Sequence, residues 1–221
     1  MEIDHIFVCV ELQVPEAEFL KDFGLTEGIR RIHQGQGTAN VCFFFHNVYL
    51  ELLWLNDSNE IQSPVVSSTG LWQRCRWQET KACPFGIALR RVTPNLLEIP
   101  FSTWNYYAPY LPSNAFIPIL ANSENLSEPL IFISPSSQKP ANYPLEKQRP
   151  LTHQAGFLEI TALRVFLPGD KNFSLEVTKL SEIGIIEFSH GNSYHLEIEF
   201  DSGKEGRLHN FHLTLPISFQ W

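Results

Sequence analysis

Cysteine is scarce in this 221-residue sequence, and the four that occur form no CxxC pair. The lack of such a pair argues against a structural zinc site with thiolate ligands. Two of the cysteines lie within apolar stretches, where a thiol packs as a small hydrophobic side chain. This usage is typical of a protein from a reducing compartment.

Long apolar runs and an excess of positive charge are also missing. The longest apolar runs, such as IFVCV, are far shorter than the roughly 20 residues that span a bilayer. No basic segment followed by an apolar one opens the sequence, so we expect a cytoplasmic protein. The net charge of −8, with both signs mixed along the chain, argues against nucleic acid or an anionic membrane as the main partner. A small or cationic ligand fits better, and a homodimer stays possible.

The motifs of two common enzyme classes are absent. There is no GxSxG, and no serine or cysteine lies in a recognisable nucleophile context, so covalent hydrolysis has no support. The stretch QGQGTAN has Asn40 where the third glycine of GxGxxG would stand, and it runs between two predicted strands, which excludes a dinucleotide loop. A turn between the two strands accounts for the two glycines of this stretch. Thr38 and Asn40 at its exit either contact a ligand or cap the turn.

Apolar periodicity divides the chain into three parts. A hydrophobic content of 43% is enough for one large domain or two small modules. The order strand–helix–strand–strand–strand is predicted for residues 1–57 and again for residues 151–221. Residues 58–150 form a connecting segment, in which LWQRCRW predicts a short helix and several short strand candidates alternate with prolines.

Five stretches of the sequence resemble one known group of proteins. They are IDHIFV, HQGQGTANVCFFF, YLELLWL, GLWQR and PFGIALR, all within residues 3–91. They resemble the glyoxalase-like proteins of the vicinal oxygen chelate superfamily, which also contains bleomycin-resistance proteins and extradiol dioxygenases. The resemblance implies an α+β fold of paired βαβββ modules, whose curved mixed sheet encloses a cavity. It also implies a divalent metal ion held by His, Glu and Gln side chains.

His5 and Glu51 are the polar residues that stand out in the two apolar strands of the first module. Alternation places each among apolar neighbours, and a half-buried carboxylate without a partner costs several kcal/mol. We therefore expect a cation or a donor beside Glu51, with His5 within about 4 Å. A structural Glu–His contact in a metal-free cavity is the alternative.

The resemblance implies that His5 and Glu51 are metal ligands and that Glu51 takes part in catalysis. It places the third ligand at Glu197 or Gln220 of the last part of the chain, because Thr161 occupies the position expected on that part's first strand. A histidine and carboxylate donor set suits Mn, Fe(II), Ni or Zn.

Aromatic residues with nearby arginines are candidates for binding the substrate. Arg74 lies among tryptophans in GLWQRCRW and is suited to hold a carboxylate. Trp104 and Tyr107 belong to an aromatic segment that can line an apolar pocket. In the alternative interpretation these aromatics are core residues and the arginine faces solvent.

Two functions follow from these features. The first is a metal-dependent enzyme, a lyase, isomerase or dioxygenase, that polarises a small oxygen-bearing substrate. The second is a metal-free protein that binds or sequesters a small molecule, as resistance proteins of the superfamily do. Whether a third metal ligand is present distinguishes the enzyme from the metal-free binding protein.

Overall fold

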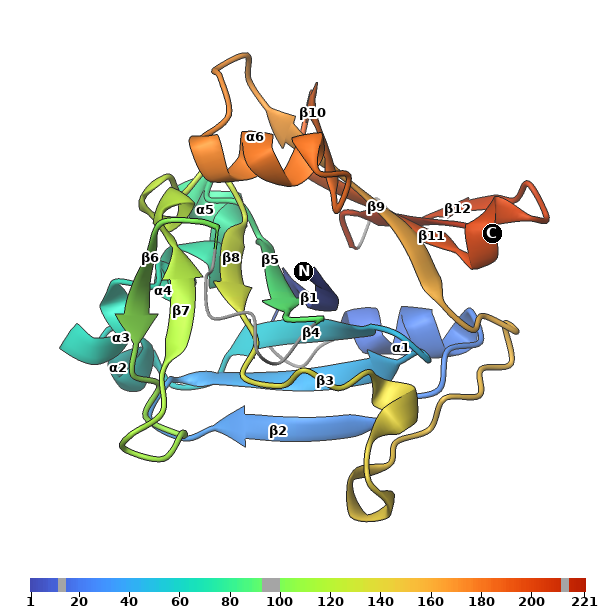
Figure 1. Cartoon of the computed structure of the whole chain (residues 1–221), viewed down its shortest axis with the longest axis horizontal. Helices are drawn as coiled ribbons and strands as arrows, with labels where there is room; N and C mark the ends of the chain where they lie inside the picture. The colour runs from blue at the N-terminus through green and yellow to red at the C-terminus, as the bar shows by residue number, and fades with distance from the viewer. Residues whose placement is uncertain (12–14, 93–99, 212–214) are drawn as a thin grey trace.

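The computed structural model describes residues 1–11, 15–92, 100–211 and 215–221. Figure 1 shows two mixed β-sheets with few helices. The larger sheet has the strand order β2-β3-β4-β1-β5-β8-β7-β6, and the smaller has the order β10-β9-β11-β13-β12. The α+β class with a mixed sheet, predicted from the sequence, is confirmed.

The elements have the following bounds. The larger sheet consists of β1 (Glu2–Cys9), β2 (Ile29–His33), β3 (Thr38–Phe44), β4 (Tyr49–Leu55), β5 (Phe85–Arg90), β6 (Thr103–Tyr106), β7 (Ile117–Leu120) and β8 (Leu130–Ile133). The smaller consists of β9 (Ile160–Pro168), β10 (Glu187–Gly191), β11 (His195–Phe200), β12 (Leu208–Asn210) and β13 (Ile217–Gln220). The α-helices are α1 (Pro15–Asp22), α2 (Ser58–Ile61), α3 (Pro64–Ser67), α4 (Leu71–Cys75), α5 (Trp77–Thr80) and α6 (Leu175–Glu182). The 3-10 helices are η1 (Ala121–Glu124), η2 (Pro140–Asn142), η3 (Leu145–Lys147) and η4 (Asp201–Gly203).

The larger sheet is built from two halves with the same strand arrangement. β1 pairs in parallel with β4, and β5 pairs in parallel with β8. The halves meet where β1 runs antiparallel to β5. The second half therefore consists of β5, β6, β7 and β8, which lie within residues 58–150, the segment predicted from the sequence to be a connection. The strands of residues 151–221 form a separate sheet and do not complete the first.

Alternate residues of β1 pack into two different cores. Ile6 and Val8 belong to a large core that is shared with apolar residues of β9, β11 and β13. Phe7 and Cys9 belong to a smaller cluster with residues of β4, α4 and β7. The larger core fixes the sheet from one side and leaves the other side to surround a cavity.

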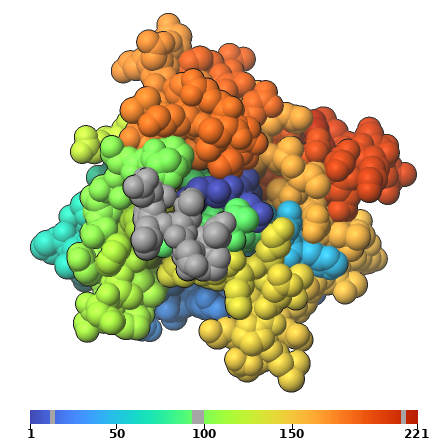
Figure 2. Space-filling model, in the orientation of Figure 1, coloured from blue at the N-terminus to red at the C-terminus, as the bar shows by residue number. Residues whose placement is uncertain are grey.

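A segment of residues 134–149, which contains η2 and η3, runs along the edge of this second side. It forms part of the face seen in Figure 2, where it is yellow and lies beside the blue N-terminal strands. None of the helices in the described ranges has the length and apolar character needed to cross a bilayer.

Candidate functional site

A cavity of about 560 Å³ lies on the inner side of the larger sheet. Its lining includes His5 on β1, His33 on β2, Asn40 on β3 and Glu51 on β4. Further lining residues come from α4, from the strands β6 to β8 and from residues 134–149. No described residue of the smaller sheet lines it.

His5 and Glu51 face each other across neighbouring strands. The pairing of Phe7 with Glu51 puts Glu51 one step along the inner face from His5. The His5 Nε2 atom lies 3.9 Å from Glu51 Oε2, within the separation expected from the sequence. The two residues are only 9% and 5% exposed, so their accessible parts face the cavity that they line.

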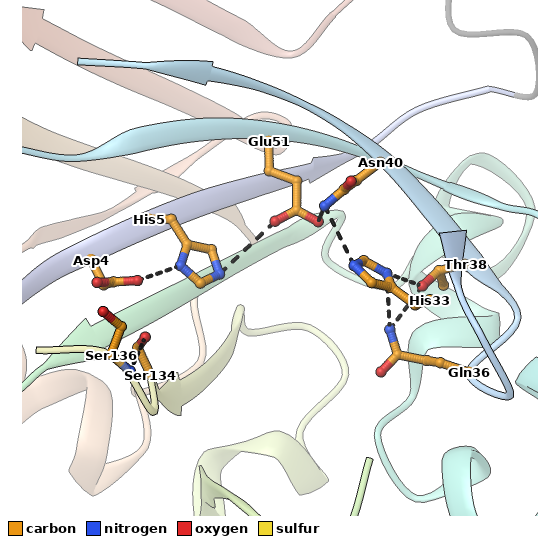
Figure 3. A network of polar contacts seen from close by, with 9 residues as sticks. All are labelled: Asp4, His5, His33, Gln36, Thr38, Asn40, Glu51, Ser134 and Ser136. Carbon is orange, nitrogen blue, oxygen red and sulfur yellow. Dashed lines mark hydrogen bonds and ion pairs between the residues drawn. The ribbon is translucent and has the colours of Figure 1, made fainter. Parts of the chain in front are cut away.

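Asp4 fixes the orientation of the His5 ring. The register between β1 and β5 shifts between Ile3 and His5, a bulge that places Asp4 beside the imidazole. Asp4 Oδ2 lies 2.7 Å from His5 Nδ1, and the ring stacks on Tyr49 with a centroid distance of 4.4 Å. Because a carboxylate only accepts hydrogen bonds, Nδ1 carries the proton when His5 is neutral. Nε2 is then an acceptor that points toward Glu51 (Figure 3).

On its other side, Glu51 is held by an amide. Asn40 Nδ2 donates to Glu51 Oε1 at 2.8 Å, and the same nitrogen lies 3.5 Å from His33 Nε2. Thr38 Oγ1, 2.9 Å from His33 Nδ1, contacts the other nitrogen of that ring. Figure 3 shows this network, which connects the sheet from β1 to β2.

The same network continues to the far wall of the cavity. Gln36 Nε2 donates to Thr38 Oγ1 at 2.8 Å, and Tyr106 Oη donates to Gln36 Oε1 at 2.9 Å. Thr38 is fully buried, so its hydroxyl positions His33 and Gln36 and does not face the cavity. The turn QGQGTAN thus supplies polar residues of the wall.

Burial sets the protonation of the titratable groups around Glu51. Burial lowers the pKa of His33, although the charge of Glu51 opposes this shift. Burial also raises the pKa of Tyr49 well above its ordinary value, and that of Tyr143 to about 12. His33 is therefore neutral near pH 7, and these tyrosines remain hydrogen-bond donors.

The rest of the lining is mainly apolar. Phe7 packs so closely over β5 that a Cβ atom at Gly86 would lie 1.9 Å from its ring. Further apolar side chains come from all around the cavity: Leu53, Leu71, Ile117, Ile119, Leu130 and Phe132.

The second half of the sheet offers no partner for a metal ion. β5 and β8 hold the positions that correspond to β1 and β4, but their sequences FGIALR and LIFI contain no histidine, carboxylate or amide side chain. Within the described parts of the chain, no group of three His, Cys, Asp or Glu side chains can hold a metal ion. The residues therefore do not fit the metal centre that the resemblance implies.

Both candidates for the third ligand lie elsewhere. Glu197 is on β11 of the smaller sheet, where it forms an ion pair with Arg164. Gln220 Oε1 accepts a hydrogen bond from the same Arg164 at 3.2 Å. Thr161 lies on β9, and its hydroxyl donates to Glu199 Oε1. None of them lines the cavity, because the smaller sheet packs against the opposite side of β1.

Arg74 also lies away from the cavity lining. It is completely buried, and its Nη1 donates to the backbone oxygens of Cys83 and Glu128 at 3.0 and 2.7 Å. The guanidinium therefore joins two loops and is not positioned to hold a ligand carboxylate. The sequence does not indicate this role of Arg74, because a tryptophan-rich segment is equally compatible with the wall of a pocket.

The cavity wall takes its aromatic side chains from the predicted segment, but from other residues than Trp104 and Tyr107. Trp104 Nε1 donates to Ser123 Oγ at 3.0 Å, and Tyr107 is 55% exposed. Neither lines the cavity, whereas Tyr106 and Tyr110 do. Tyr106 is the last residue of β6, and Tyr107 and Tyr110 lie beyond the strand, where alternation no longer applies.

The comparisons with known proteins bear mainly on the first part of the chain. Residues 3–97, less than half of the sequence, match the family described as "Glyoxalase-like domain". The match includes both His5 and Glu51 and supports a fold of the vicinal oxygen chelate type for this part. No curated protein matches the sequence.

One solved structure is similar over nearly the whole chain. It is described as the crystal structure of a hypothetical protein from Staphylococcus aureus. The similarity covers 99% of this chain and 98% of that chain, with a TM-score of 0.57 and 13% sequence identity. At this identity the comparison shows the fold alone.

Proposed function

We propose that the protein binds a small, partly apolar molecule in the cavity of the larger sheet without a metal ion. Glu51 and His5 fix the polar end of this ligand. The volume of about 560 Å³ is in the range of small-molecule sites, and the lining combines apolar side chains with a few convergent polar groups. The match to a glyoxalase-like domain supports a ligand-binding cavity of this type.

One observation carries the proposal: Glu51 Oε2 and His5 Nε2 lie 3.9 Å apart at the cavity wall, and neither atom has a hydrogen-bond partner among the described residues. Glu51 Oε2 accepts no hydrogen bond from the described residues, and the His5 Nε2 atom is 3.9 Å away, beyond hydrogen-bond length. Glu51 as a whole is only 5% exposed, so its charge is poorly solvated, and a donor on a ligand in the cavity would stabilise it. A hydroxyl or secondary amine of a ligand supplies one such donor to Glu51 Oε2, and an ammonium group can donate to both atoms.

The metal-dependent alternative is less well supported. A divalent ion with open positions for substrate typically has three protein ligands, and no group of three His, Cys, Asp or Glu side chains among the described residues is arranged to hold one. A donor group on an organic ligand needs no third residue. The lyase, isomerase and dioxygenase reactions that depend on a metal therefore have less support than metal-free binding.

Metal-free proton transfer is the second candidate, and the contact of 2.7 Å between Asp4 and His5 favours it. A carboxylate that orients a histidine, whose other nitrogen faces the cavity, is a common arrangement for a general base. The test is deuterium exchange into hydroxyacetone in D₂O, followed by NMR. Exchange that is lost in His5→Asn supports an enzyme, and exchange equal to the buffer rate argues for binding alone.

The binding proposal is tested with a fluorescent probe of suitable chemistry. N-(p-tolyl)-2-naphthylamine is apolar, neutral and carries one N–H donor. We expect it to bind chelator-treated protein at one site, with fluorescence enhancement. Leu111→Trp, which adds bulk at a half-buried lining residue, should weaken binding, whereas Leu208→Trp on the exposed face of β12 should not. Equal binding by both variants would place the probe elsewhere and contradict the proposal.

A further inference from the structure

Three basic residues line the cavity in a protein whose net charge is −8. They are Arg31 on β2, Lys147 at the end of η3, and Arg149 just beyond it. Among the described residues, none of the three forms an ion pair with a carboxylate. Arginines elsewhere in the chain are commonly paired, as Arg90 is with Glu2 and Arg164 with Glu187.

The two adjacent arginines of β2 show that this difference depends on the face of the sheet. Arg31 is the register partner of Asn40, which lines the cavity, whereas Arg30 is the partner of Val41, which lies in the opposite core. Arg30 forms an ion pair with Glu27 at 2.7 Å. Only the arginine on the cavity side lacks a carboxylate partner.

Arg149 approaches the same side of the cavity from the segment of residues 134–149. The charges of Arg31 and Arg149 both act on the Cys42 thiol, where they oppose the rise in pKa that burial causes. Cys42 is the register partner of Glu51, so both cations lie near one place in the cavity wall. They come from separate segments of the chain, and they converge only in the folded protein.

The charges in the cavity are therefore segregated. The inner part carries the carboxylates of Asp4 and Glu51, with Glu51 Oε2 lacking a donor. The rim carries Arg31, Lys147 and Arg149, of which the first two are exposed. Unpaired cations at the edge of a partly apolar cavity favour an anion, and guanidinium groups suit the planar geometry of oxyanions.

We propose that the ligand carries an oxyanion, such as a carboxylate, sulfonate or phosphate, at the end opposite its donor group, and that Arg31, Lys147 and Arg149 bind it. This inference rests on the proposed function, because it assumes that the ligand occupies the cavity. It defines the substrate class as a small molecule with an apolar body, one hydrogen-bond donor and one anionic end.

Two probes that differ only in one anionic group test the inference. The probe 6-(p-toluidino)naphthalene-2-sulfonate has the donor and the sulfonate on opposite ends of its naphthalene, and N-(p-tolyl)-2-naphthylamine is its neutral counterpart. We expect the sulfonate to bind about tenfold more tightly at low ionic strength, with the advantage falling as salt is added.

The triple variant R31Q/K147Q/R149Q should lose that advantage and keep the affinity for the neutral probe within about twofold. Arg30→Gln is the matched control, because it removes a positive charge from the same strand on the other face. Circular dichroism checks that each variant is folded. Equal affinity of the two probes for the wild type, or an undiminished advantage in the triple variant, would overturn the inference alone. Failure of the neutral probe to bind the cavity would instead overturn the proposed function, and this inference with it.

Discussion

Replacing Glu51 with glutamine should make the protein more stable and less able to bind its ligand. Glu51 is 5% exposed, its Oε1 accepts one hydrogen bond from Asn40, and its Oε2 faces the acceptor Nε2 of His5 at 3.9 Å. In Glu51→Gln the oxygen that Asn40 contacts is kept. The new amide nitrogen takes the place of Oε2, and at a pH where His5 is neutral it turns a donor toward His5 Nε2.

The expected gain in stability follows from the free-energy cost of burying a poorly paired charge. Removing that charge should raise the free energy of unfolding by about 1–2 kcal/mol. For a protein of this length the melting temperature should rise by roughly 2–8 °C. The loss of a hydrogen bond to a charged group should weaken binding of the neutral amine probe by about tenfold or more.

Glu128→Gln is the matched control, because Glu128 is a buried carboxylate whose two oxygens are both satisfied. Its Oε1 accepts from the backbone N–H of Ser174 at 2.7 Å, and its Oε2 accepts from the Ser174 hydroxyl at 2.6 Å. An amide nitrogen there would oppose a donor, so this variant should lose about 1–3 kcal/mol. Thermal unfolding by circular dichroism, at about pH 8.5 to keep histidines uncharged, compares the two. If Glu51→Gln is destabilised as much as the control, Glu51 is a structural residue and the reasoning is refuted.

Three further predictions concern the frame of the site. Gly86→Ala should lower the free energy of unfolding by about 1–3 kcal/mol in urea titrations, because the added methyl group collides with the Phe7 ring. Arg74→Leu should cost about 2–5 kcal/mol, since two buried backbone oxygens lose their donor, and the folded fraction should bind the neutral probe as the wild type does. Burial lowers the pKa of His153, whose Nδ1 accepts the N–H of Thr26. The free energy of unfolding should therefore keep its full value above about pH 6.5 and fall below that pH, because the unfolded chain takes up the proton at a higher pH than the folded protein does. Urea unfolding at about pH 7.5 and 5.5 should show a smaller difference for His153→Gln, and an unchanged difference would contradict this.

The sequence was sufficient to predict those strands in which apolar and polar residues clearly alternate. β1 and β4 show such alternation, and this placed His5 and Glu51 on one inner face. It could not indicate Asp4, because the bulge that turns this residue toward the cavity leaves no periodic signal. His33 was overlooked for a related reason, since it ends a strand that is polar on both faces.

The second half of the larger sheet was harder to predict. β6, β7 and β8 have four residues each, which is too short for a period of two to be distinguished from chance. In the last part of the chain β9, β10 and β11 are longer, and its pattern repeats the order predicted for the first part, so the sequence favours it as the partner. Glu197 was proposed as a ligand on that basis. The contacts of β1 with β5 show that the partner strands lie earlier in the chain.

Calorimetric titration of chelator-treated protein with Mn²⁺, Ni²⁺ and Zn²⁺ at about pH 7.5 tests the central claim, a metal-free ligand cavity, most directly. His5 and Glu51 supply two ligands, and no group of three His, Cys, Asp or Glu side chains among the described residues is arranged to hold a metal ion, so we expect no saturable binding. His5→Ala should then give the same heats as the wild type. Binding of one ion per chain with a dissociation constant below about 10 µM, abolished in His5→Ala, would contradict the account and restore the metal-dependent enzyme.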